Sequence, residues 1–138
     1  MTDEQAIIDV AIAYTWALDS KQLDQLRDVF TADATADLDG VHCDGLDAIV
    51  ARIDRPISRL DVTQHLVGNH QVRVDGDTAT HRCQLHGQHV KRGTPGGDNY
   101  VIGGIYEDQL ARTADGWRIV HRRLTGTWTA GNPAVVGR

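Results

Sequence analysis

Apolar residues follow a helical spacing up to about residue 60 and a strand spacing beyond it. In the first part they recur every three or four positions, and in the second part they alternate with polar residues. Helices that precede antiparallel strands usually pack on one face of the sheet that those strands form. The pattern therefore predicts an α+β fold, with N-terminal helices packed on a curved, mostly antiparallel sheet.

Three helices are predicted in the first part of the chain. Thr2 and Gln5 form a capping-box pattern that begins a helix over residues 6–18. This segment is apolar on almost every side, so we expect the helix to be enclosed. The other elements expected here are a helix over 20–30, a short strand over 34–39, and a helix over 46–53 that Asp44 caps and the Pro56 region ends.

Four long strands are predicted in the second part. Asp75-Gly76 and Asp115-Gly116 are two-residue hairpin signals. The strands expected around them cover residues 61–74, 77–90, 99–113 and 117–128. Residues 131–138 carry no pattern, and we expect a tail that is mobile or crosses to a partner subunit. Without repeats or linkers, the chain is expected to form one domain over 1–130, followed by this tail.

Composition and charge narrow the classes of function. With 41% hydrophobic and 24% charged residues, the 138-residue chain resembles an ordinary folded, soluble domain. The net charge of −5 argues against binding to nucleic acid or to an anionic membrane. No apolar run reaches membrane length and no signal-peptide pattern opens the chain, so we expect a cytoplasmic protein. Cys43 and Cys83 are expected to be buried small side chains, not a disulfide or a metal-ligand pair.

One acidic residue stands out at the end of the first predicted helix. A stripe on this helix consists of Ile8, Ile12, Thr15 and Asp19. Asp19 would then face the core, where an unpaired carboxylate is costly. His65, on the first long strand, is the partner that would make a proton-transfer pair. The alternative is that Asp19 only caps the following helix while His65 is an ordinary residue of the sheet.

Short motifs along nearly the whole chain resemble the SnoaL-like branch of the nuclear transport factor 2-like superfamily. The motifs that carry the resemblance are Tyr14-Thr15-Trp16-Ala17-Leu18-Asp19, Gln64-His65-Leu66-Val67-Gly68-Asn69, Val74-Asp75-Gly76-Asp77-Thr78-Ala79, Gly104-Ile105-Tyr106-Glu107-Asp108, and Asp115-Gly116-Trp117-Arg118-Ile119. The resemblance implies a cone-shaped α+β barrel of cystatin-like topology that encloses a deep, apolar pocket. Families on this fold include scytalone dehydratase, bile acid 7α-dehydratase, hexachlorocyclohexane dehydrochlorinase, ketosteroid isomerase and polyketide cyclases.

The resemblance also implies roles for particular residues. Asp19 and His65 match the acid and the histidine of the dehydratase and dehydrochlorinase members. Tyr14 matches a pocket tyrosine of the bile acid dehydratase, although it could equally be a core residue. Arg122 matches a pocket arginine of several members. We therefore expect Asp19 and His65 to be catalytic, and Tyr14 and Arg122 to contact a substrate.

Two positions depart from the family pattern or leave a choice open. Ala36 stands where the dehydratases carry an aromatic residue, and Tyr106 is a possible substitute that would also bind substrate. Strand alternation from Trp117 places Arg123 on the inner face, unless a bulge shifts the register in favour of Arg122. The remaining arginine would then meet solvent or a partner subunit.

The histidines do not predict a metal site. His65 and His70 fall on opposite faces of a regular strand, while His81 and His89 share a face but lie ~26 Å apart along it. No zinc-type spacing and no phosphate-binding glycine motif occurs in the chain. We therefore expect neither a metal nor an organic cofactor.

These features predict a cofactor-independent lyase or isomerase that acts on a small hydrophobic molecule, with polycyclic and steroid-like molecules among the candidates. One alternative is a non-catalytic protein that binds such a molecule. Another is a structural subunit, resembling the β subunit of ring-hydroxylating dioxygenases, with a pocket filled by side chains. A homodimer is expected through the outer face of the sheet, with contributions from Trp128 and the apolar residues 133–136.

Overall fold

The predicted helices and strands follow each other in the expected order, and two short elements, a strand over Val41–Asp44 and a 3-10 helix over Pro133–Val136, are additional. The computed structural model describes all 138 residues. Its elements are α1 (Asp3–Asp19), the 3-10 helix η1 (Leu23–Asp28), β1 (Phe30–Leu38), β2 (Val41–Asp44), α2 (Leu46–Ile57), β3 (Val62–Asp75), β4 (Thr78–Val90), β5 (Asn99–Thr113), β6 (Gly116–Gly131) and the 3-10 helix η2 (Pro133–Val136). The predicted α+β class is confirmed.

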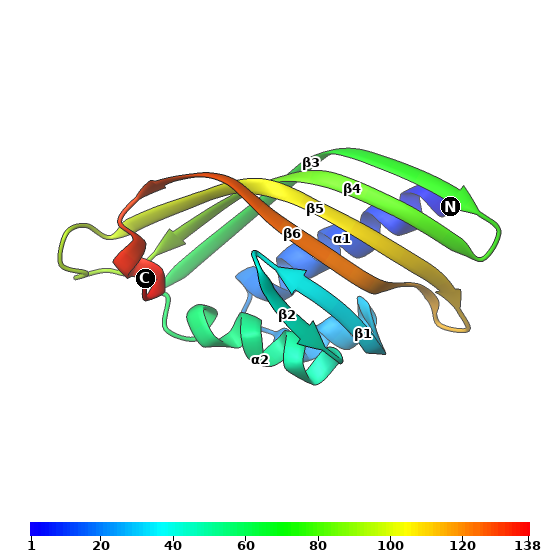
Figure 1. The fold of residues 1–138 in the computed structure, drawn as a ribbon, viewed down its shortest axis with the longest axis horizontal. Coiled ribbons are helices and arrows are strands. Elements are labelled where there is room, and N and C mark those ends of the chain that lie inside the picture. Colours follow the sequence, from blue (N-terminus) through cyan, green and yellow to red (C-terminus); the bar gives the residue numbers. More distant parts are fainter.

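One six-stranded sheet forms the body of the molecule. Its strand order is β2-β1-β6-β5-β4-β3, and every pair is antiparallel except β1 with β6. The long strands arch over α1, and α2 lies on the same side of the sheet (Figure 1). The predicted curved sheet is therefore confirmed, but it stays open, with β2 and β3 as its edges.

The core lies between the inner face of the sheet and the helices. Alternate residues of β4 are buried from Ala79 to His89, as the strand period requires. The main apolar cluster contains 21 buried residues drawn from α1, α2 and the strands. Cys43 and Cys83 are both buried and free, as predicted.

Helix α1 is less enclosed than its composition predicts. Thr2 caps its start by accepting a hydrogen bond from the backbone N–H of Gln5, at 3.1 Å. However, Trp16 is 68% exposed and Ile12 is 37% exposed. The buried face consists instead of Ile7, Ala11, Tyr14, Thr15, Ala17 and Leu18. The predicted stripe lies at the margin of this face, so Asp19 sits at the edge of the helix–sheet interface and not at its centre.

Two other helix predictions were wrong in extent. The helix expected over 20–30 is only the short η1, because Phe30 already pairs with Ile119 as the first residue of β1. Helix α2 follows Gly45 without a side-chain cap and continues through Pro56 to Ile57. Burial of one face against the core stabilises this helix beyond what its end signals predict. Strand β2 was not predicted at all.

Two bulges decide which side chains of the long strands face the helices. In β3 the pairing shifts between Gly68 and Gln71, where Asn69 has a positive φ of 55°. The shift brings His70 to the inner face, contrary to the expected alternation from His65. In β6 the pairing shifts between Ile119, the partner of Leu110, and His121, the partner of Gln109. The extra residue between them turns Arg122 to the inner face. The choice between the two arginines is thus resolved toward Arg122, which is 1% exposed.

The C-terminal segment packs on its own chain. Residues Pro133–Val136 form η2, which Asn132 caps by accepting a hydrogen bond from the N–H of Ala134. Val135 is buried in a small cluster with Leu60 and Tyr100. The expected mobile tail is therefore a docked turn. None of the helices combines the length and the apolar character that crossing a bilayer demands.

Candidate active site

Asp19 and His65 meet where the end of α1 touches β3. Oδ1 of Asp19 lies 2.6 Å from Nδ1 of His65, and Oδ2 accepts the backbone N–H of His65 at 2.8 Å. Thr63, two residues earlier on the same face of β3, donates its hydroxyl to Oδ1 at 2.9 Å. The carboxylate thus holds both the backbone and the ring of His65. Sequence reasoning missed Thr63, although the strand period would have placed it beside His65.

The hydrogen bonds favour the charge of Asp19 and select the tautomer of a neutral His65. Partial burial opposes the charge of Asp19, but the hydrogen bonds from His65 and Thr63 outweigh it and hold the pKa of Asp19 below its ordinary value. An ionised Asp19 only accepts hydrogen bonds, so the proton of the neutral imidazole resides on Nδ1. Nε2 of His65 is then left with a free lone pair, as a general base requires.

His65 faces a cavity of about 510 Å³. Apolar side chains from α1, α2 and the sheet supply much of its wall: Leu18, Leu38, Val41, Ile53, Ile57, Leu85, Ile102, Leu124 and Val136. Tyr14, Tyr106 and His89 line it together with His65. This volume is within the usual range for pockets that bind small molecules. Near His65 the apolar wall thus carries imidazole and hydroxyl groups, and the same cavity is also lined by charged side chains, including Arg52, Arg55 and Arg59.

Gly87 keeps space open beside His65. The two residues are partners in the β3–β4 register. A Cβ at position 87 would lie 3.4 Å from Cδ2 and 3.6 Å from Nε2 of His65, and 3.4 Å from Cε1 of His89. A side chain at position 87 would therefore pack directly against both imidazole rings, and glycine leaves that space open.

His89 is a second cavity histidine, whose spacing in the sequence bears only on the metal question. Its ring lies edge-to-face with that of His65, with centroids 5.6 Å apart, and its Nδ1 is 3.3 Å from the carbonyl oxygen of Tyr100. Burial and the neighbouring His65 lower the pKa of His89 to about 4. His89 is therefore neutral near pH 7. Its place two residues after Gly87, on the same face of β4, is the signal that could have revealed it.

Neutral His89 should make the stability of the fold pH-dependent. The unfolded chain binds a proton at this site from about pH 6.5 downward, whereas the folded chain does so only near its pKa of about 4. The contribution of neutral His89 to the free energy of unfolding is thus fully present above the unfolded pKa. It decreases as pH falls from about 6.5 toward about 4, and the loss is about 2 kcal/mol at pH ~5. Urea unfolding at pH ~7.5 and ~5 should show this loss in the wild type and a smaller one in His89→Gln. The exposed His42→Gln variant is the control, and an unchanged pH dependence in His89→Gln would contradict the assignment.

Tyr14 and Tyr106 contribute the hydroxyl groups of the cavity wall. Their rings meet edge-to-face at 5.6 Å, and both side chains are 2% exposed. Burial raises the pKa of Tyr14 and, more strongly, that of Tyr106, so both hydroxyls keep their protons and can donate hydrogen bonds. Ala36 is buried in the core. The hydroxyl groups of the cavity thus come from α1 and β5 and not from β1.

Arg122 lies behind these tyrosines and is not among the residues that line the cavity. Its guanidinium carbon is 4.3 Å from the centroid of the Tyr14 ring and 4.0 Å from that of Tyr106. Nε and Nη2 donate to the two carboxylate oxygens of Asp108, at 2.7 and 2.9 Å. Arg122 was expected to contact a substrate directly. In the structure it contacts Tyr14 and Tyr106, which line the cavity.

The ion pair continues into a buried chain of polar residues. Oδ2 of Asp108 also binds Nδ1 of His81 at 2.8 Å, and Nε2 of His81 lies 2.9 Å from Nδ1 of His70. Burial opposes the charge of Asp108, but Arg122 and His81 together lower the pKa of this carboxyl. The ligand atoms of His70, His81 and Cys83 come within 4.8 Å of one another. This grouping is not predictable from strand spacing, because a strand without the β3 bulge would turn His70 outward.

Comparisons with known proteins agree with this architecture. A protein of Penicillium crustosum called terrestric acid biosynthesis cluster protein E is 32% identical over 144 aligned positions, which cover 100% of this chain and 92% of that protein. Two solved structures from Novosphingobium aromaticivorans are similar. One, named as a candidate aromatic ring hydroxylase, has a TM-score of 0.86 and 28% identity, and covers 97% of this chain and 96% of its own. The other, named as a candidate scytalone dehydratase, has a TM-score of 0.84 and 21% identity, and covers 93% of this chain and 86% of its own.

The family assignment rests on a match over most of the chain. The model of the SnoaL-like domain matches residues 1–123, from the start of α1 to the middle of β6. This range contains the acid–histidine pair, both cavity tyrosines and the Asp108–Arg122 ion pair. The chain belongs to the SnoaL-like domain family, within the nuclear transport factor 2-like fold.

Proposed function

We propose that this protein is a cofactor-independent lyase or isomerase that removes a proton from a small hydrophobic substrate. The observation that carries the proposal is the Asp19–His65 pair, with 2.6 Å between Oδ1 and Nδ1 and with His65 lining a cavity of about 510 Å³. A neutral imidazole held by an ionised carboxylate is a competent general base.

The proposed step follows from the protonation of the pair. Nε2 of His65 takes a proton from a carbon next to an electron-withdrawing group, and Asp19 stabilises the imidazolium that forms. In a dehydration, the electrons of the C–H bond form the new double bond while the C–O bond breaks. The imidazolium then returns its proton to the departing oxygen, which leaves as water. In an isomerisation, the same proton returns to another carbon of the substrate.

The tyrosines suit the charge that develops in this step. Removal of a proton beside a carbonyl places negative charge on the carbonyl oxygen. Tyr14 and Tyr106 keep their protons because burial raises the pKa of each hydroxyl. We assign them the role of donors to this oxygen, where a fixed donor in an apolar site stabilises charge better than water does.

The names of two similar proteins support the proposal. The Penicillium crustosum relative is named for the biosynthesis of a small organic acid. A structure of the same fold is named as a candidate scytalone dehydratase, an enzyme class that eliminates water. Both names favour chemistry on a small molecule, and neither specifies a substrate for this chain.

A substrate screen in D₂O tests the proposal directly. We expect purified protein to catalyse deuterium incorporation, loss of water or loss of halide for some member of a panel of cyclic β-hydroxyketones, unsaturated ketones and halogenated rings. Mass spectrometry of each compound, with and without protein, measures all three outcomes. If no compound exchanges or eliminates faster than in the presence of a His65→Ala control, the lyase or isomerase assignment fails.

A non-catalytic subunit is the second candidate. Leu66 and Trp128 favour it, because they are 59% and 48% exposed on the outer face of the sheet. Such a subunit would have a pocket filled by side chains, which the cavity argues against. The same outer face is where we propose that a homodimer forms. Sedimentation of the purified chain distinguishes a stable homodimer from a subunit that requires a larger partner.

A further inference from the structure

Three arginines form a stripe along α2, next to its buried face. Arg52 and Arg55 are spaced i and i+3 on the helix, so at about 100° per residue they lie roughly 60° apart, and Arg59 follows in the turn just after the helix ends. The adjacent buried stripe consists of Ile49, Ile53 and Ile57. All three arginines line the same cavity as His65. Positive charge is thus placed beside the apolar wall of the candidate active site.

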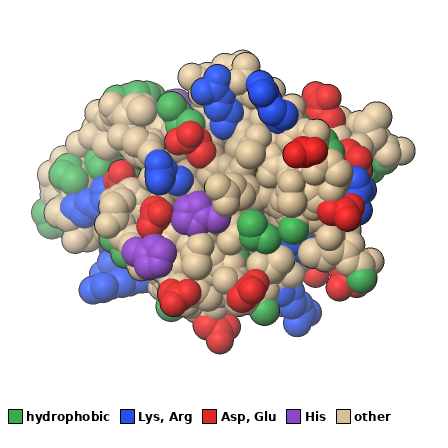
Figure 2. All heavy atoms as spheres, turned by 45° about the vertical axis from the view of Figure 1, so that its right-hand side comes forward, with side chains coloured by type: hydrophobic (Ala, Val, Ile, Leu, Met, Phe, Trp, Pro, Cys, Tyr) green, Lys and Arg blue, Asp and Glu red, His purple; other side chains and the backbone are tan.

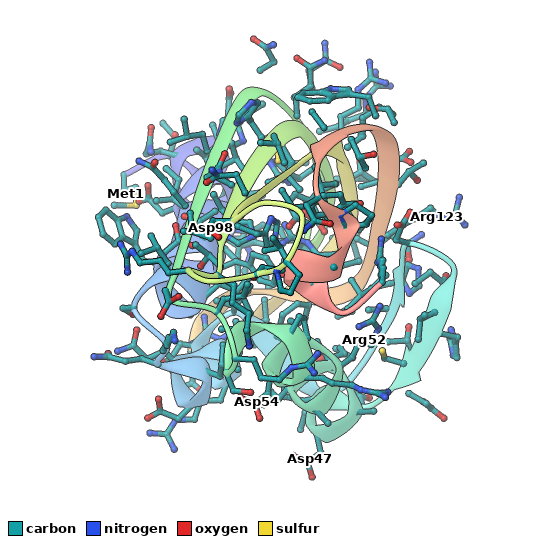
Figure 3. The ribbon with its side chains drawn as sticks, turned by 90° about the vertical axis from the view of Figure 1, so that its left-hand side faces the viewer. Met1, Asp47, Arg52, Asp54, Asp98 and Arg123 are labelled. Carbon is teal, nitrogen blue, oxygen red and sulfur yellow. The ribbon has the colours of Figure 1, made fainter.

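The acidic residues of α2 point the other way. In Figure 3, Asp47 and Asp54 lie along the lower, outer side of the helix, whereas Arg52 lies on its upper side. Both acidic residues are exposed, and Arg52 is half-buried. The helix therefore keeps its own carboxylates away from the arginines that line the cavity.

The arginine stripe also lacks partners elsewhere in the chain. None of the ion pairs within 4.0 Å involves Arg52, Arg55 or Arg59. On the face shown in Figure 2, by contrast, basic side chains are interspersed with acidic ones. The chain has 19 acidic and 14 basic residues. Yet the cavity is lined by four arginines and a single acid, Asp39, whose nearest arginine contact is Arg138 at 3.9 Å.

The helix dipole explains only part of this arrangement. Basic residues near the C-terminal end of a helix are stabilised by its partial negative charge. This accounts for Arg55 and Arg59, which lie in the last turn and just beyond it. Arg52 lies in the middle of the 12-residue helix, where the dipole has little effect. A separate reason is needed for its half-buried position at the cavity.

We propose that the α2 arginines bind an anionic group, a carboxylate or a phosphate, of a ligand whose apolar body fills the cavity. A guanidinium binds such a group with two parallel hydrogen bonds. The statement that this ligand is the substrate rests on the proposed function; the binding site itself does not. The substrate class becomes an amphipathic acid with an acidic C–H group that reaches His65.

Two fluorescent probes with the same aromatic body test the site. 8-Anilino-1-naphthalenesulfonate carries an anionic group, and N-phenyl-1-naphthylamine is its neutral counterpart. We expect the anionic probe to bind about ten-fold more tightly at low salt, and to weaken as NaCl screens the arginines. Arg52→Gln, Arg55→Gln and Arg59→Gln should each weaken the anionic probe by about three-fold or more and leave the neutral probe unchanged. Displacement by 2-naphthoate, and less readily by 2-naphthalenemethanol, extends the test to carboxylates.

Matched variants separate this inference from the proposed function. Arg123→Gln removes an exposed arginine that does not line the cavity and should change neither probe. His65→Ala should lower turnover by about 10²–10⁴-fold but keep the preference for the anionic probe. Equal binding of both probes, or no effect of the three α2 variants, would overturn the anion site even if turnover is found. A clear preference for the anionic probe without turnover of any compound would instead support the anion-binding site and contradict the proposed catalytic function.

Discussion

Replacing His65 by alanine should lower kcat/KM by about 10²–10⁴-fold on any accepted substrate, which is the usual contribution of a positioned general base. The cavity gains volume in this variant, so the loss should be in kcat more than in binding. Asp19→Asn should also lower kcat strongly. An amide at position 19 does not stabilise an imidazolium, and it can donate to Nδ1 and so move the proton to Nε2. Steady-state kinetics, with binding of the neutral probe measured in parallel, check both expectations.

The chain contains its own control for these two variants. Asp37 and His42 also form an acid–histidine pair, with 2.7 Å between Oδ1 and Nδ1, but on the surface at β1 and β2. Neither of them lines the cavity. Asp37→Asn and His42→Ala should therefore retain wild-type kinetics. If His65→Ala is as active as His42→Ala, then the internal pair has no part in catalysis.

Much of the fold is predictable because its signals are local. The two hairpin turns fix the long strands, and the strand limits from β3 to β6 agree with the predicted ones to within a few residues at most ends. The predicted helix limits place Asp19 at the C-terminal end of α1, as observed. The pairing of Asp19 with His65 follows from the family resemblance more than from spacing, since 46 residues separate the two in sequence.

The remainder of the site depends on geometry that local patterns do not contain. The bulges in β3 and β6 have no turn signal as strong as an Asp-Gly pair, yet they decide that His70 and Arg122 face inward. Helix α1 is apolar nearly all round, so its sequence does not show that Trp16 is exposed while Tyr14 is buried. His89 has no distinctive motif, and only the register with Gly87 and His65 shows that it belongs to the cavity.

Asp108→Asn should destabilise the fold by about 3–5 kcal/mol, because it leaves a buried arginine without a countercharge. Arg122 and Asp108 are 1% and 4% exposed, and burial of each charge is compensated by the other. Asparagine keeps the shape of the side chain and an oxygen that can accept the hydrogen bond of His81, so the expected loss reports the charge. Urea unfolding near pH 7.5 measures it. Asp3→Asn, which disrupts the exposed pair with Arg112, is the control and should cost much less.

A double variant shows whether the cost belongs to the pair. Arg122→Met fills similar space without charge, so combining it with Asp108→Asn should recover most of the lost stability. Additive losses in the double-mutant cycle would mean that the ion pair is not the cause. The recovered protein should still be a poor catalyst, because methionine cannot hold the Tyr14 and Tyr106 rings by cation–π contact as the guanidinium does. Stability that returns without activity would identify Arg122 as a positioning residue for the two cavity hydroxyls.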